Sequence, residues 1–277
     1  MSIHDDPKDY SDLKLAVKLL EAPSITARLS NIIGSPIEGA VKRLPASVSK
    51  KVNGVVEAAL HKSVDVALSS LDNTPNKLAS NKLHKLYAAG SGAIGGAFGF
   101  AALFVELPIS TTLMMRSVAD IARSEGFDLQ DLTTKLACVE VFAMGGKTKS
   151  DDATETGYYL TRGFTTETMR HLSKELVEIA AKQGAHAMSA SFTPSQAGKW
   201  LAALIEKVAS QFGVVITNKF AAQAVPLLGA ATGATINTLF LDFYQEMARG
   251  HFIIKRLEHK YGYEAVKAEY VVMRKGC

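Results

Sequence analysis

The sequence predicts an all-α protein, a single multi-helix bundle with two central helices that are rich in glycine and alanine. Most segments space their apolar residues three and four positions apart, which is the period of an amphipathic helix. No segment shows a convincing apolar–polar alternation between hairpin turns. Two uncharged runs, 86–105 and 220–241, are dominated by small and apolar residues. We expect about nine to twelve helices in one domain, 1–277.

Local signals place the first helices in the N-terminal part, about residues 8–73. A helix carrying Leu13 is expected to end before Pro23, because proline disfavours helix at the residue before it. Ser24 is a suitable N-cap for the next helix, and Gly34 a suitable end. The boundaries of these two short helices are therefore predicted from the sequence alone.

A long helix is expected after Pro45, reaching roughly Leu71, and the core of the domain follows over about residues 78–277. Within that core, Asp128 is a plausible N-cap of an apolar helix. Gly145 is its expected stop.

Two further start signals and one long helix are predicted toward the C-terminus. Asp152 and Glu155 have the spacing of a capping box. The segment Thr193–Gln196 combines a cap, a proline at the first helical position and a glutamine at the third. The longest predicted helix runs from Pro226 to about Tyr261, with a break expected near Gly250 because glycine has low helix propensity.

The first uncharged run, 86–105, lies between Lys85 and Glu106 and has the ~20 residues that span a bilayer. Only seven of its residues are strongly apolar, so it is a poor span by itself. Its glycines recur at i, i+3, i+4 and i+7 and form one bare helical stripe, suited to close approach of another helix: Gly92, Gly95, Gly96 and Gly99.

The second run repeats this pattern, since Pro226 is followed by Gly229 and Gly233 at four-residue spacing. The two runs are expected either to pack on each other or to enter a membrane as similar elements. In the membrane alternative, residues 86–115 are expected to form a hairpin with its bend near Glu106 and Pro108. Basic residues flank both runs, which favours contact with an anionic leaflet.

Glu106 is a carboxylate between two apolar stretches, so it must pair, protonate or reach water. Arg116 or Arg162 is the expected partner, with a hydroxyl from Tyr158 or its neighbour. The pair either fixes helix register or serves a pocket for a ligand or lipid head group. Asn237 is expected to make an interhelical hydrogen bond.

Composition and motifs narrow the function classes. Net charge is +4, and basic and aromatic residues do not interleave, so we expect no nucleic-acid partner. Cys138 and Cys277 form no CxxC pair, which fits a reducing, cytoplasmic location. We expect no metal, no cofactor and no catalytic residue, because no nucleophile elbow, P-loop or HExxH motif occurs.

Three blocks of the sequence, 92–131, 141–163 and 224–262, resemble the EcsC protein family as an ordered set. The resemblance brings no reaction with it, because none of the blocks is a catalytic signature. It implies twelve recurrent positions in this chain: Gly92, Gly96, Glu106, Pro108, Arg116, Tyr158, Arg162, Pro226, Gly229, Gly233, Asn237 and Arg249.

The leading functional hypothesis is a non-enzymatic protein that docks on, or partly inserts into, the cytoplasmic leaflet of the inner membrane. An anionic membrane surface or lipid is then its partner, and a protein partner remains open. The alternative is a soluble module that holds a lipid or acyl chain between its small-residue helices. A second alternative, a hydrolase-type enzyme, would use Glu106 or His251.

Overall fold

The computed structural model describes residues 3–34, 37–42, 44, 46–69, 71–80, 84, 100–145, 158–159, 161–163, 194–223 and 229–275. Every regular element in these residues is a helix, so the all-α prediction is confirmed. The elements are η1 (Ile3–Asp5), α1 (Pro7–Leu20), α2 (Ile25–Ile33), α3 (Ile37–Val41), α4 (Ala46–Ser69), α6 (Phe100–Ser124), α7 (Leu132–Val141), α9 (Pro194–Gln223), α10 (Gly229–Tyr261) and α11 (Tyr263–Arg274).

Four of the short-range boundary signals are confirmed. Helix α1 ends at Leu20, and the Ser24 hydroxyl accepts a hydrogen bond from the Ala27 amide at the start of α2. Gly34 follows α2 in the left-handed conformation, at φ 70°, which glycine adopts without steric cost. Helix α9 starts at Pro194, as its start signal predicts.

Helix α6 contradicts the predicted hairpin, because it runs unbroken past Glu106 and Pro108. A proline inside a helix removes one backbone hydrogen bond. The Thr112 hydroxyl donates to the Pro108 carbonyl at 2.8 Å but does not replace that bond, and the flanking residues Glu106 and Leu107 are buried. Packing around this turn therefore outweighs the local tendency of Pro108 to break it.

Two other predicted boundaries are wrong. The N-cap position of α7 is Asp131 and not Asp128, whose carboxylate instead accepts hydrogen bonds from Asn73 and the Gln130 amide. Helix α10 does not break at Gly250, because that glycine lies against Leu20 of α1: a Cβ built on it would lie 2.6 Å from Leu20 Cγ. Glycine is therefore needed at position 250 because Leu20 leaves no room for a Cβ atom.

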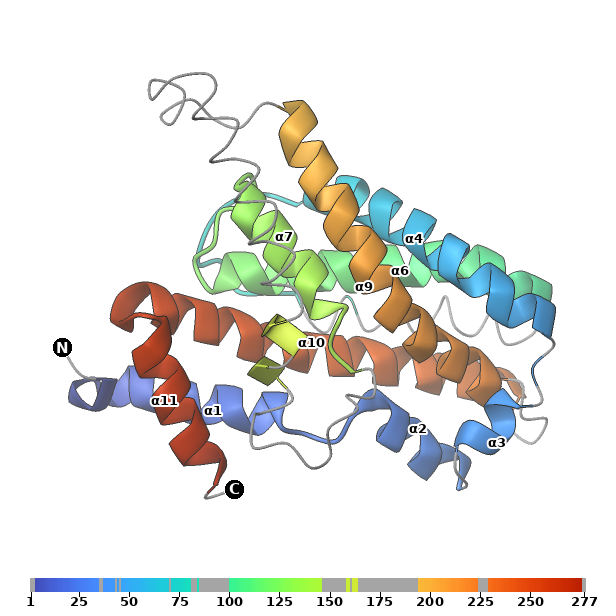
Figure 1. The fold of residues 1–277 in the computed structure, drawn as a ribbon, viewed down its shortest axis with the longest axis horizontal. Coiled ribbons are helices and arrows are strands. Elements are labelled where there is room, and N and C mark those ends of the chain that lie inside the picture. The colour runs from blue at the N-terminus through green and yellow to red at the C-terminus, as the bar shows by residue number, and fades with distance from the viewer. Residues whose placement is uncertain are drawn as a thin grey trace.

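Helix α10 is the central element of the bundle and packs against α1, α2, α6, α7, α9 and α11 (Figure 1). An aromatic cluster fills the core between α7, α9 and α10, with Phe142 stacked on Tyr244 and Phe212 set edge-on to both. Helices α4 and α6 lie side by side. The C-terminal end of α4 lies near that of α6, where Arg123 donates to the Asp72 carbonyl, so the two helices run in the same direction.

Candidate functional site

Glu106 forms the first of three buried polar centres. Lys219 Nζ on α9 lies 3.1 and 3.2 Å from the two Glu106 carboxylate oxygens and 3.4 Å from the Ser110 hydroxyl. Asn237 on α10 donates to Glu106 Oε1 at 2.8 Å, which is the interhelical hydrogen bond expected of that residue. One carboxylate therefore joins α6, α9 and α10.

The Glu106 centre corrects the predicted partners, because neither Arg116 nor Arg162 pairs with Glu106. The side chains of Glu106 and Lys219 are 4% and 0% exposed, so the ion pair is closed to solvent. A closed pair of this kind offers no carboxylate to a substrate. Lys219 was missed from the sequence, although its position beside the second uncharged run is a usable signal.

Tyr158 and Arg162 belong to a second centre, at the C-terminal half of α10. Arg162 donates to both carboxylate oxygens of Glu258, at 2.6 and 3.0 Å. The Tyr158 hydroxyl lies 3.1 Å from His251 Nδ1. On the other side of its ring, His251 Nε2 lies 3.3 Å from Glu140 Oε2 on α7. Tyrosine, histidine and glutamate thus form a buried chain.

The charges around His251 indicate which of its ring nitrogens carries the proton. Burial lowers the pKa of His251 to about 4, and the adjacent Glu140 carboxylate opposes the shift without cancelling it. Burial alone would raise the pKa of Glu140, but contact with His251 and Lys255 holds it below its ordinary value. We therefore assign neutral His251 with hydrogen on Nε2, facing the carboxylate, so that Nδ1 accepts from Tyr158.

Three residues around Asp120 on α6 form a third centre, which the sequence did not predict. Arg123 Nη2 pairs with one Asp120 oxygen. The other oxygen accepts from the Ser80 amide at 2.6 Å and lies 3.3 Å from His84 Nε2. Asp120, Arg123 and His84 are each at most 4% exposed. We call this group the Asp120 anchor.

The Asp120 anchor fixes residues 71–80, here the anchored loop, against the C-terminal end of α6. Arg123 donates to the Asp72 carbonyl at 2.9 Å, and the Asn76 amide donates to the Arg123 carbonyl at 2.8 Å. Leu78 nevertheless points away from the protein, with 89% of its surface exposed. The bundle thus presents a large apolar side chain on a backbone that it holds in place.

The remaining predicted positions do not gather at one site. Pro108 and Arg116 lie on α6, Gly229 and Gly233 on the first turns of α10, and Arg249 on the exposed face of α10. The other predicted positions lie outside the described residues: Gly92, Gly95, Gly96, Gly99 and Pro226. Among the described residues no group of three or more His, Cys, Asp or Glu side chains could hold a metal ion.

One helix of the described part is long and apolar enough to cross a membrane, over Gly198–Ala222 of α9. Half of its most apolar window is buried inside the bundle. Glu206 and Lys207 lie on its exposed face. This is the pattern of a helix that packs one face on the bundle.

Comparison with known proteins gives one positive result. The family model described as the EcsC protein family matches residues 14–257 of the 277 residues. That range contains the Glu106 centre, the Asp120 anchor, the anchored loop and all of the second centre except Glu258. No curated protein and no solved structure matches the chain. The family model covers most of the sequence, and the chain therefore belongs to the EcsC protein family.

Proposed function

We propose that this chain is a non-enzymatic, cytoplasmic protein that docks on the anionic inner leaflet through the anchored loop and the uncharged segment after it. Leu78 is the observation that carries the proposal, because a leucine with 89% of its surface exposed is held out on a fixed loop. Burying a leucine side chain contributes about 1.5–3 kcal/mol. Leu78 does not gain this free energy while its side chain is in water, but it would gain it by entering a lipid interface.

Because the backbone of the anchored loop is already fixed, burying Leu78 in a membrane would cost little conformational entropy. Three hydrogen bonds tie this loop to α6, all of them through its own backbone, at residues 72, 76 and 80. Ordering a free loop on binding costs about 1–2 kcal/mol per residue. A loop that is already ordered avoids most of that cost when Leu78 enters the interface.

The sequence after Leu78 supports the same surface. Lys77 precedes it, Lys82 and Lys85 follow it, and the uncharged run 86–105 starts directly after Lys85. Each basic residue near an anionic leaflet contributes about 1 kcal/mol of attraction. Apolar and basic residues in this order are typical of segments that lie at a membrane interface.

The geometry of Glu106 supports a non-enzymatic role. The enzyme alternative required an accessible carboxylate, and the Glu106–Lys219 pair is closed to solvent. The other residue of that alternative, His251, is 0% exposed and uses both ring nitrogens in contacts with Tyr158 and Glu140. Neither residue of the enzyme alternative is available to a substrate in this state.

Flotation of the full chain with vesicles tests the proposal. We expect binding at low salt to vesicles of phosphatidylcholine with phosphatidylserine and much weaker binding to phosphatidylcholine alone. Leu78→Gln should lower that binding about tenfold, as loss of one buried leucine predicts. Val214→Gln removes another exposed apolar side chain, on α9, and should leave it unchanged.

The variant Gly96→Leu provides a second test in the same flotation experiment, because it adds apolar surface to the uncharged run. We expect it to raise vesicle binding. The proposal is wrong if the wild-type chain and the Gly96→Leu variant both stay in the soluble fraction at low salt. It is also wrong if Leu78→Gln and Val214→Gln weaken binding equally, because the anchored loop would then have no special part in docking.

A further inference from the structure

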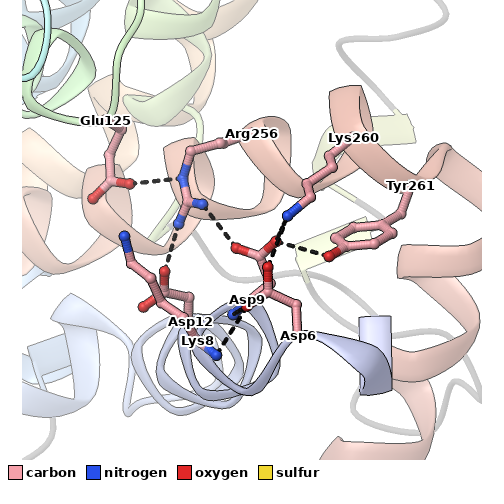
Figure 2. Close-up of polar contacts among 8 residues, drawn as sticks. All are labelled: Asp6, Lys8, Asp9, Asp12, Glu125, Arg256, Lys260 and Tyr261. Atoms are coloured by element: carbon pink, nitrogen blue, oxygen red, sulfur yellow. Dashed lines mark hydrogen bonds and ion pairs between the residues drawn. The ribbon is translucent and has the colours of Figure 1, made fainter. Parts of the chain in front are cut away.

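The first residues of the chain are held to the bundle mainly by charge. Arg256 of α10 reaches Asp9 and Asp12 of α1, at 3.1 and 2.7 Å. Lys260, one helical turn later, reaches Asp6 and Asp9 at 2.9 and 2.6 Å. Figure 2 shows the three aspartates, Asp6 at the N-cap of α1 and the other two within the helix, on the side that faces these two cations.

Apolar packing of α1 starts only after this charged stretch. Within residues 3–12, here the N-terminal strap, Ile3 and Asp9 alone are buried. From Leu13 onward the packing changes, and Leu13 and Val17 are both fully buried. The family match also starts at residue 14, after the strap. Release of the strap therefore exposes one apolar side chain of the core, Ile3, while Leu13 and Val17 stay buried.

Carboxylates outnumber cations in this contact. Glu125, just beyond α6, also accepts from Arg256, at 3.2 Å, so that four carboxylates face Arg256 and Lys260 (Figure 2). Lipid phosphates and carboxylates accept the same guanidinium and ammonium donors. The aspartates of the strap therefore form ion pairs with two cations that would also bind an anionic surface.

The position of these cations connects them with the anchored loop. Glu125 follows the C-terminal end of α6, which also carries Asp120 and Arg123. Five residues of helix correspond to about 7–8 Å, so Arg256 reaches α6 within two turns of the Asp120 anchor. The cations and Leu78 thus lie at the same end of the bundle.

We propose that the N-terminal strap and an anionic membrane surface compete for Arg256 and Lys260, so that release of the strap adds both cations to the docking surface. The inference rests on the proposed function for its partner. Release of the strap itself is a property of the isolated protein. The two parts are therefore measured separately.

Hydrogen exchange on the wild-type chain tests the release. Salt shortens the range of these partly exposed ion pairs, from about 10 Å at ~0.1 M to about 3 Å at ~1 M. We expect exchange in peptides of residues 3–12 to rise about tenfold over that range, while peptides of residues 13–20 keep their protection. Equal protection of both segments at high salt would overturn the proposal.

Vesicle binding of a charge variant tests the competition. The triple variant Asp6→Asn, Asp9→Asn and Asp12→Asn removes the acids and keeps a side chain that can cap α1. Asp131→Asn, Glu206→Gln and Glu264→Gln together change the net charge equally at three exposed positions outside the contact. We expect the first variant to bind anionic vesicles about tenfold more tightly than wild type, and more tightly than the second.

A further variant tests whether the gain in vesicle binding depends on the two cations. Arg256→Gln and Lys260→Gln, added to the first triple variant, should abolish its gain in binding. Equal gains by both triple variants, or a gain that survives these two added changes, would overturn the strap proposal while leaving the proposed function intact. If neither the wild type nor any of these variants floats with the vesicles, both proposals fail. The exchange experiment uses unmodified protein, so a variant that misfolds does not remove the test.

Discussion

Lys219 on α9 and Glu106 on α6 form an ion pair with side chains that are 0% and 4% exposed. The two residues are 113 positions apart in the sequence, and Asn237 on α10 adds a hydrogen bond from a third helix. Charges taken out of water are stabilised only when their partners are all in place. This pair therefore couples the relative positions of three long helices.

Removing one partner of this pair should be more harmful than removing both. Lys219→Met leaves Glu106 buried and unpaired, and we expect the free energy of unfolding to fall by about 3–5 kcal/mol. The double variant Glu106→Gln with Lys219→Met leaves no buried charge and should be more stable than the single variant. Urea denaturation measures both. Additive losses would show that the two residues do not depend on each other.

Stability should depend on pH through His251. The folded pKa of His251 is about 4, below its ordinary 6.5, so the unfolded chain binds this proton at a higher pH than the folded chain. The contribution is fully present above about pH 6.5 and is lost as the pH falls toward 4. We expect the free energy of unfolding to drop by about 2 kcal/mol between pH 7 and pH 5.

His251→Gln separates this effect from the other histidines. The variant lacks this titrating group, so its stability should fall less between pH 7 and pH 5 than that of the wild type, even if it is lower at pH 7. His259→Gln changes an exposed histidine eight residues later and should keep the wild-type slope. A His251→Gln protein with the wild-type slope would contradict the assignment of His251 as buried and neutral.

Most signals that act within a few residues could be predicted from the sequence, whereas the partners of most distant residues could not. Ser24 and Pro194 set helix starts through their own backbone geometry, and both predictions are confirmed. The partner of Glu106 depends on which helices pack together, and the sequence offered Arg116 and Arg162 equally well. The Asp120 anchor was missed because His84 and Asp120 come together only through packing of the anchored loop on α6.

The packing of Gly250 against Leu20 could not be predicted from the sequence either, and it leads to a third prediction. Helix propensity favours alanine, so Gly54→Ala, at an exposed position of α4 with nothing near its Cβ, should stabilise the protein by about 0.5–1 kcal/mol. At position 250 the new Cβ would lie 2.6 Å from Leu20 Cγ. We expect Gly250→Ala to destabilise by about 1–3 kcal/mol in thermal unfolding. Equal effects of both changes would show that α1 does not pack closely on α10.

Arg162 gives the last prediction, because its geometry distinguishes a guanidinium from any positive charge. It donates to both oxygens of Glu258 and lies over the rings of Tyr158 and Tyr159, at 5.6 and 5.8 Å from their centroids. A lysine cannot reproduce this planar fork, so we expect Arg162→Lys to lower stability by about 1–3 kcal/mol. Arg274→Lys changes a half-exposed pair with one contact to Glu21 and should shift stability by less than about 1 kcal/mol. Thermal unfolding of the two variants compares them directly, and similar small shifts would mean that charge alone holds Arg162 in place.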